Sequence, residues 1–459
     1  MNEDQGVEER SNAVKSDEDE RKPLFTCHLS YVLMDDNNNI DSKGDAQAQL
    51  DKQNLSILPE TGETLLIPLN DILEISEGDY RIDLYLSSRE KLMLFSIGYS
   101  YEAFLRTLFE LRNEIILKYM LMEEKLRTSG IETEFVYYDN NKRILQKGIS
   151  ETRLYETAIV ILPQKGEPVR IPYSDILEIK AEDYTVTLNT EIGESIVFSK
   201  MGSQFDLFKK ALTEAINQLL LKAQLLLQEL APQVSPLLIR KAAHLMKEGR
   251  AAKKSDIESI SPELWRQLER KLEKINLKEE YDFLRGISQN EQVSVGFKRG
   301  LLGDPKGEYI WFLVAIYSNN PKEPGNAIAM EAVSSAEEGR ATYFFRISGR
   351  KDYSKEGDFE DLRRKTEDLI RMINHCLIVI NFRREPIYLS NDRLDDPEYI
   401  KYKISVQKIP QLQTLRDLFI GRVVHLTLDQ WKKDTTDLLE FNINTQDDSA
   451  KWLKNEKYT

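Results

Sequence analysis

The side chains best suited to chemistry on a small molecule lie in the C-terminal part of the chain, where cations interrupt apolar runs. Guanidinium and ammonium groups bind phosphate or carboxylate, and an imidazole can act as an acid or a base near neutral pH. The candidates are Lys298, Arg299, Arg383, Arg384 and His425. They predict an anion site in which Lys298, Arg383 and Arg384 form a clamp and His425 supplies acid/base chemistry.

A purely structural role for these charges is the competing interpretation, and the sequence favours it. The stretch 296–304 holds three glycines around Lys298 and Arg299, yet it lacks the Gly-Lys-Ser/Thr ending of a phosphate-binding loop. There is also no Gly-x-Ser-x-Gly motif, so an enzyme is kept only as an alternative. Charges in apolar surroundings must be paired. The expected salt bridges are Glu331 with Arg346 and Glu385 with Arg422.

Cysteines and histidines are few. The chain has two cysteines, Cys27 and Cys376, and four histidines in 459 residues. Two cysteines cannot build a disulfide framework, which indicates a reducing compartment. Each cysteine has a histidine as its sequence neighbour, and adjacent side chains diverge on a strand or a helix. We therefore expect no metal site and no other cofactor.

Composition and charge restrict the class of protein further. The chain carries 63 Lys plus Arg against 77 Asp plus Glu, a net charge of −14, and 41% of its residues are hydrophobic. Such a charge disfavours general binding to nucleic acid or anionic membranes. No uncharged run reaches the ~18 residues that a membrane span needs. Residues 1–23 contain no apolar run and predict a disordered acidic tail instead of a signal peptide, so we expect a cytoplasmic protein.

One segment departs from this acidic balance. Residues 232–290 have helical periodicity and predict a helical linker, with a helix that starts at Pro236 after a Ser235 cap. We place six cations on that helix: Arg240, Lys241, Lys247, Arg250, Lys253 and Lys254. Such a cluster can contact phosphates, so a nucleic-acid-associated factor is the second functional hypothesis. A basic helix paired with acidic surfaces of the same chain is favoured, because no aromatic residues are interleaved for base stacking.

An internal repeat is the strongest signal in the sequence. Residues 57–113 align without a gap onto 161–217, at a constant offset of 104, and 21 of the 57 positions are identical. The identities include Ile-Leu-Pro at 57–59, Ile-Pro at 67–68 and Asp-Ile-Leu-Glu-Ile at 71–75, each with its counterpart in the second copy. Self-similarity at a fixed offset indicates duplication of one structural unit.

Each copy predicts a small antiparallel sheet followed by one helix. In the second copy, short β-rich runs at eight- to twelve-residue spacing are separated by turn residues. These runs are 157–162, 169–172, 176–179, 185–188 and 195–199. From Phe205 onward apolar residues recur every three or four positions, as on one face of a helix. Gly98 and Gly202 mark the corner between sheet and helix, where a backbone turn with positive φ is expected.

This order of elements, with the Ile-Pro and Asp-Ile-Leu-Glu-Ile phrases, resembles the pleckstrin-homology-like (PH or GRAM) fold. The resemblance covers residues 23–231 as two copies. It implies binding domains for lipid headgroups, peptides or partners within complexes. Lipid-binding members carry a basic cluster between their first two strands, whereas copy one has Asp-Asp-Asn-Asn-Asn at 35–39 and a polar insertion to Gln53. Copy two offers only 140–143 and Lys147, so phosphoinositide binding is disfavoured.

The remainder predicts a separate α+β domain with an antiparallel sheet, over 291–459. Three strong strands are expected as a meander at 309–317, 327–333 and 342–347, followed by a helix at 359–380. Short helices are expected near 412–419 and 430–439. A third, divergent PH-like copy is the alternative description of this domain. The whole chain is thus predicted as an acidic tail (1–23), two PH-like domains (24–128 and 129–231), a helical basic linker (232–290) and the C-terminal domain.

The leading functional hypothesis is a non-enzymatic cytoplasmic adaptor or scaffold that binds protein partners through the tandem PH-like domains. Two binding domains on one chain raise the effective concentration for a bivalent partner. A nucleic-acid-associated factor and an enzyme or sensor for an anionic small molecule are the alternatives. The leucine-rich stretch 219–227 either packs on the central helices or forms a homodimer seam.

Overall fold

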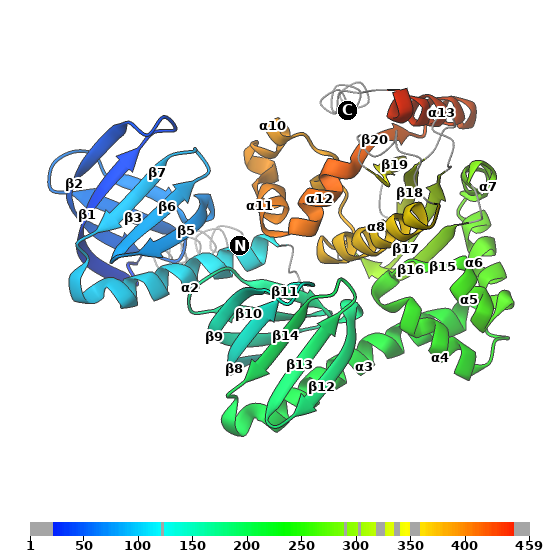
Figure 1. Cartoon of the computed structure of the whole chain (residues 1–459), viewed down its shortest axis with the longest axis horizontal. Coiled ribbons are helices and arrows are strands. Elements are labelled where there is room, and N and C mark those ends of the chain that lie inside the picture. Colours follow the sequence, from blue (N-terminus) through cyan, green and yellow to red (C-terminus); the bar gives the residue numbers. More distant parts are fainter. Residues whose placement is uncertain are drawn as a thin grey trace, which may run out of the picture.

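The structure is a computed structural model that describes residues 22–120, 124–288, 292–301, 304–317, 326–334, 340–348 and 359–444. The predicted acidic tail lies outside these residues, except for 22–23. The fold is a mixture of helices and antiparallel sheets (Figure 1). None of the helices within the described ranges combines the length and apolarity needed to cross a membrane.

The first unit is a seven-stranded antiparallel sheet followed by one helix. Its strand order is β4-β3-β2-β1-β7-β6-β5. Alternate side chains of the strands and one face of the helix form a single core, in which Leu84, Leu94, Phe104 and Leu108 are fully buried. The elements are β1 (Phe25–Met34), β2 (Ile40–Leu50), β3 (Asn54–Pro59), β4 (Leu65–Pro68), β5 (Ile72–Gly78), β6 (Arg81–Leu86), β7 (Lys91–Phe95) and α2 (Tyr101–Tyr119).

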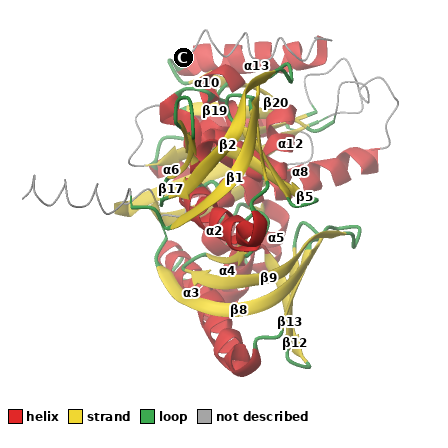
Figure 2. Cartoon of the chain, turned by 90° about the vertical axis from the view of Figure 1, so that its left-hand side faces the viewer, coloured by secondary structure: helices red, strands yellow, loops and turns green. Residues whose placement is uncertain are grey.

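The second unit repeats this arrangement, with strand order β11-β10-β9-β8-β14-β13-β12. Figure 2 shows its long strands β8 and β9 as a curved surface. Because both sheets place equivalent strands in the same order, the topology agrees with the internal repeat. The elements are β8 (Leu126–Tyr138), β9 (Ile144–Tyr155), β10 (Ala158–Pro163), β11 (Val169–Pro172), β12 (Ile176–Glu182), β13 (Thr185–Thr190), β14 (Ser195–Ser199) and α3 (Phe205–Leu230).

The corner before each helix and the segment after β1 can be compared with the sequence predictions. Gly98 and Gly202 have φ values of 66° and 55°, which supports their expected role at the corner before the helix. The polar insertion expected up to Gln53 is wrong, because β2 occupies most of it. The sequence does not indicate this strand, because only Ala46, Ala48 and Leu50 of its side chains are buried.

The central segment is helical. The prediction that its six cations share one helix is wrong. The helix that begins at Pro236 ends at Leu245, and a short 3-10 turn with Glu248 at a positive φ of 56° breaks the chain direction. Lys247, Arg250, Lys253 and Lys254 therefore lie outside this helix, the last of them at the start of the next one. The elements are α4 (Pro236–Leu245), η5 (Lys247–Gly249), β15 (Ala252–Lys253), α5 (Lys254–Ile260), α6 (Pro262–Lys274) and α7 (Lys278–Ile287).

The C-terminal unit is built on a six-stranded antiparallel sheet in the order β15-β16-β17-β18-β19-β20. The predicted meander is confirmed by the pairing of β17 with β18 and of β18 with β19. The glycine-rich stretch 296–304 is not a loop, because most of it lies in strands. The strands are β16 (Val293–Leu301), β17 (Asp304–Ile316), β18 (Ala327–Ser334), β19 (Ala341–Arg346) and β20 (Phe419–Val424).

Helices cover both faces of this sheet. Along β17, Tyr309 and Trp311 belong to one apolar core, and Ile310 and Phe312 belong to the other, so the strand is buried on both sides. The second core also receives α3 and the central helices, which buries Leu220 and Leu227. The C-terminal helices are α8 (Phe359–Val379), α9 (Glu385–Tyr388), α10 (Asn391–Leu394), α11 (Ile400–Lys408), α12 (Pro410–Leu418) and α13 (Leu428–Asn444).

The leucine-rich stretch is thus explained mainly by burial within the chain. Leu219 packs in the core of the second unit, and Leu220 and Leu227 pack against the central helices. Leu221 and Leu225 remain 52% and 57% exposed. Only these two are left for the dimer seam that the sequence offered as an alternative.

Candidate functional site

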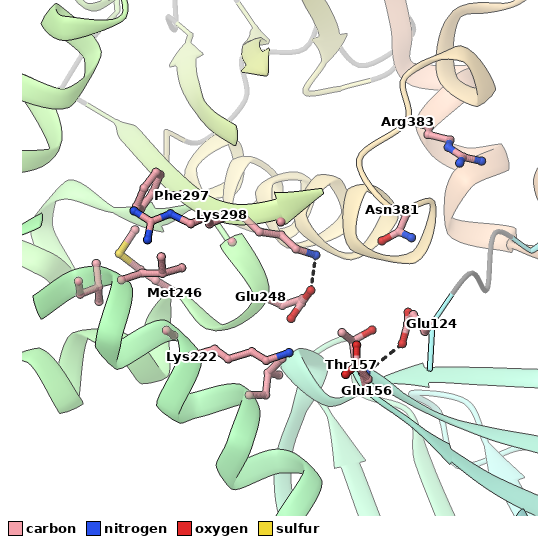
Figure 3. Close-up of a pocket in the computed structure, with 17 residues that line it drawn as sticks. Glu124, Glu156, Thr157, Lys222, Met246, Glu248, Phe297, Lys298, Asn381 and Arg383 are labelled. Carbon is pink, nitrogen blue, oxygen red and sulfur yellow. Dashed lines mark hydrogen bonds and ion pairs between the residues drawn. The ribbon is translucent and has the colours of Figure 1, made fainter. Parts of the chain in front are cut away.

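Three of the five predicted anion-binding residues line one cavity of about 250 Å³ between the second unit, α3 and the C-terminal sheet. These are Lys298, Arg299 and Arg383. In Figure 3, Lys298 reaches toward Glu248, whereas Arg383 lies on the far side of Asn381. The two cations do not converge on a common point, so the predicted clamp is not formed.

Two cations of this cavity, Lys298 and Arg299, are neutralised by the chain itself. Lys298 forms an ion pair with Glu248 and lies over the ring of Phe382. Arg299 contacts Glu229 at 2.8 Å and Glu308 at 3.0 Å. Ion pairs of this kind leave little field for a further anion, and the cavity wall adds the carboxylate of Glu156.

Arg384 and His425 lie outside the lining of this cavity. Arg384 is buried, donates to the carbonyl of Ala332 at 3.1 Å and faces the ring of Tyr343. Its role is structural, because its planar guanidinium group is held by a backbone acceptor and an aromatic face. The five predicted residues therefore do not form one site.

His425 belongs to a buried polar cluster of its own. Its Nε2 lies 2.9 Å from Oε2 of Glu331, and its Nδ1 lies 3.5 Å from Oε1 of Glu280. Thr342 donates to the same Glu331 oxygen at 2.5 Å, and Trp431 donates to Thr342 at 2.8 Å. Burial alone would lower the pKa of His425, but the hydrogen bonds and charges of the two glutamates more than offset this and raise the pKa to about 9.

This cluster corrects one predicted salt bridge. Glu331 lies opposite Thr342 in the sheet, whereas Arg346 lies opposite Ala327, so the register separates Glu331 from Arg346. The Nε of Arg346 instead donates to Asn442 at 2.8 Å. The pairing of Glu385 with Arg422 stays a prediction. Arg422 lies 4.2 Å from the centre of the Tyr388 ring.

The glycine-rich stretch has a packing explanation. A Cβ atom built at Gly296 would lie 2.1 Å from Nε1 of Trp311 and 2.3 Å from the carbonyl oxygen of Gly249. Those two groups form a hydrogen bond of 2.7 Å directly above the strand. Gly296 is therefore required for close approach of η5 to β16 and β17, a role that glycine alone can fill.

The basic cluster is divided between surface and interior. Lys247 is buried, and its Nζ donates to the carbonyl of Ile176 at 3.4 Å. Arg250 forms an ion pair with Glu191, and Lys253 contacts Glu367 at 2.7 Å. Arg240 and Lys241 are exposed on α4. The arrangement matches the favoured interpretation, a basic segment paired with acidic groups of the same chain, for two of the six cations, Arg250 and Lys253.

The contacts that join the units are not evident from the sequence. Arg112 on α2 is fully buried and donates to Glu167 of the second unit at 3.0 and 3.1 Å. Lys408 on α11 contacts the same carboxylate at 3.0 Å. Three parts of the chain therefore meet at one acidic residue. The sequence does contain one indication of this contact. The repeat places an arginine at 112 where the second copy has the apolar Ile216.

A second buried contact joins the C-terminal unit to the second sheet. Nδ1 of His375 on α8 lies 2.5 Å from Oδ2 of Asp175. Burial lowers the pKa of His375, but the charge and hydrogen bond of Asp175 outweigh it and raise the pKa. Nearby, Arg170 donates to the carbonyl of Val379 and contacts Glu124 at 2.5 Å. Charged groups buried at an interface must be paired in this way.

The junction of the two repeat units leaves a cleft of about 360 Å³ between α2 and the strands β8 to β10. Asn113 is 1% exposed and lines it. Its Nδ2 donates to the carbonyl of Gly166 at 2.9 Å, while its Oδ1 has no hydrogen-bond partner among the described residues. Buried polar atoms are rarely left unpaired. This cleft is therefore the candidate site at which a bound group could supply a missing hydrogen-bond donor.

Comparison with known proteins adds little to this geometry. No protein-family model matches the sequence, and no curated protein matches it. The solved structures that match include that of the Spt16D Pob3N heterodimer, which aligns with 37% of this chain and 85% of its own, with 12% sequence identity and a TM-score of 0.16. A TM-score of that size carries no argument about fold or function.

Proposed function

We propose that this chain is a non-enzymatic scaffold in which two PH-like units, 24–128 and 129–231, and the C-terminal unit hold protein partners at a fixed spacing. The PH-like assignment is supported by the repeat and by two seven-stranded sheets of the same strand order, each followed by one helix. Fold alone does not deliver a function. The functional part of the proposal therefore depends on how the units are joined.

The observation that carries it is the set of buried, charge-assisted contacts between units. Arg112 and Lys408 meet Glu167, and His375 meets Asp175. Breaking such pairs leaves an uncompensated buried charge, so they resist separation of the units. Binding surfaces fixed relative to one another increase the affinity for a partner that engages two of them.

The state of the predicted chemical residues supports a scaffold over an enzyme. Lys298 and Arg299 are paired with glutamates, and His425 is held between two of them. A catalytic acid or base needs access to substrate, whereas His425 faces the interior of the cluster formed by Glu280, Glu331 and Trp431.

Affinity capture of the tagged full-length chain from its native cells, with nuclease treatment and quantitative mass spectrometry, tests the proposal. We expect one or more protein partners in near-stoichiometric amount, unaffected by the nuclease. A parallel thermal-shift screen uses phosphate-bearing metabolites. Recovery of nucleic acid alone, or a stabilisation by a metabolite that Arg383→Ala abolishes, would overturn the scaffold in favour of the alternatives.

A further inference from the structure

The cleft between α2 and the second sheet has an unusual arrangement of charge. Glu132 and Glu151 are direct cross-strand neighbours on β8 and β9. Glu110 and Glu114 are four residues apart on α2, so they also lie on one face. Like charges placed opposite or one helical turn apart repel each other. All four carboxylates line the cleft.

Arg153 relieves only half of this repulsion. It contacts Glu114 at 2.5 and 3.0 Å and Glu151 at 2.8 Å, and so bridges the helix to the sheet. Within the described residues, Glu110 and Glu132 form no ion pair. The only other cation of the lining, Arg106, is exposed and likewise forms no ion pair with a described residue. The cleft keeps a surplus of negative charge that the chain does not neutralise.

The unpartnered atom of Asn113 is independent of that charge. Its Oδ1 is an acceptor, and the orientation of the amide is fixed because Nδ2 donates to Gly166. An acceptor buried without a donor costs about 1–3 kcal/mol. A ligand that carries several N–H donors would satisfy it and the two unpaired carboxylates together.

Apolar groups complete the lining. Ile149 is 54% exposed although it is a large aliphatic residue, and Leu162 and Pro163 lie beside it. Arginine and lysine side chains combine an aliphatic stem with a charged end that carries N–H donors. A divalent metal ion fits less well, because the described residues contain no group of three or more carboxylate, imidazole or thiolate side chains arranged to hold one.

We propose that this cleft binds a basic side chain, arginine or lysine, from an extended basic segment of a protein partner. The charged end lies between Glu110 and Glu132 and donates to Oδ1 of Asn113, and the stem lies on Ile149. The net charge of −14 favours the approach of a basic partner. This inference rests on the proposed scaffold function, because it gives the chemistry of one partner.

Fluorescence anisotropy with the full-length chain tests the inference. The probe is a fluorescein-labelled twelve-residue peptide with three arginines separated by glycine and serine, and its citrulline counterpart is the uncharged control. We expect Glu110→Gln and Glu132→Gln each to weaken binding of the arginine peptide about two- to fivefold. The matched control is Glu214→Gln, because Glu214 is the repeat equivalent of Glu110 on α3, outside the cleft.

A second variant occupies the cleft from within. Ile149→Arg places a guanidinium group of the chain itself at the cleft, and the position is exposed enough to accept it. We expect this variant to lose most of its affinity for the peptide while its thermal unfolding midpoint stays within about 2 °C of the parent. If a glutamine variant fails to fold, the affinity of the Ile149→Arg variant still tests whether the peptide binds in the cleft.

The outcomes separate this inference from the proposed function. If the Glu110 and Glu132 variants bind no more weakly than the Glu214 variant, net charge alone holds the peptide and the cleft is not its site. The scaffold then survives if partner capture from cells is unchanged. If capture yields no protein partner at all, the scaffold itself is wrong, whatever the peptide does.

Discussion

The guanidinium group of Arg112 lies 3.0 and 3.1 Å from the two carboxylate oxygens of Glu167, although the two residues belong to different repeat units. The same side chain donates to the carbonyls of Ile72 at 2.8 Å and Leu73 at 2.6 Å. Burial lowers the pKa of Arg112, and Glu167 acts in the opposite direction. One side chain thus joins the closing helix, the edge of the first sheet and the second unit.

Replacement of Arg112 should weaken this junction. Arg112→Ala leaves the carbonyl of Ile72 without this donor. Lys408 still contacts the carbonyl of Leu73 at 2.7 Å and the carboxylate of Glu167 at 3.0 Å. We therefore expect a loss of about 1–3 kcal/mol in the free energy of unfolding. Urea unfolding of the full chain, followed by tryptophan fluorescence and circular dichroism, measures it. We expect the two signals to separate if the first unit unfolds before the rest.

Arg106 provides the control on the same helix. It is exposed and forms no ion pair with a described residue, so Arg106→Ala should change the free energy of unfolding by no more than about 0.5 kcal/mol. Equal effects of the two substitutions would mean that the buried contacts of Arg112 contribute no net stability.

The fold was predictable where the sequence pattern was local. Identical phrases at 71–75 and 175–179 reveal the repeat, and three nearly continuous apolar runs give the meander at 309–347. Strand β2 was not predictable from hydropathy. Most of its residues are polar, and its few buried side chains lie near its end. The helix from Pro236 ends earlier than predicted, because the residue type at Glu248 does not indicate a positive φ there.

The candidate site was less predictable than the fold. Lys298 and Arg383 do reach one cavity, but sequence position cannot show that Glu248 neutralises the first of them. The cleft beside Asn113 exists only because α2 packs on the second unit. Asn113 and its repeat equivalent Asn217 are the same residue type, yet only the first is buried. Such differences arise from tertiary contacts, which periodicity does not encode.

The close approach at Gly296 gives a second prediction. Gly296→Ala forces a methyl group against the indole nitrogen of Trp311 and the carbonyl of Gly249. We expect a loss of about 2–3 kcal/mol in the free energy of unfolding, as in other overpacked sites. Gly286→Ala is the control, because a Cβ there meets nothing within 4 Å and the residue lies in helix α7. That variant should be unchanged or up to about 1 kcal/mol more stable. If both substitutions change the free energy of unfolding equally, close packing does not explain the glycine at 296.

The contact between His375 and Asp175 gives a third prediction. Burial lowers the pKa of His375 and Asp175 raises it, so Asp175→Asn should lower the pKa of His375, because only the charge of Glu194 then remains to oppose burial. Selective ¹³C labelling of the four histidines and an NMR titration measure this. His244, whose pKa is lowered by burial, Lys247 and Arg240, should keep its titration curve. An unchanged pKa for His375 would show that Asp175 is not its main partner.

The cluster around His425 makes the stability of the protein depend on pH, and the sign follows from the direction of the shift. The pKa of His425 is raised to about 9 in the folded chain, against about 6.5 when unfolded. The folded state therefore holds this proton more tightly, so the stabilisation is complete below about pH 6.5 and is lost as the pH rises through about 9. We expect about 2–3 kcal/mol of stability to disappear across this window because of His425. The measurement is urea unfolding at pH 6.5, 7.5, 8.5 and 9.5 for the parent chain and for His425→Gln. The glutamine side chain cannot titrate, so the difference between the two stabilities should shrink steadily with rising pH. A difference that stays constant over the four values would mean that His425 is neutral between Glu280 and Glu331.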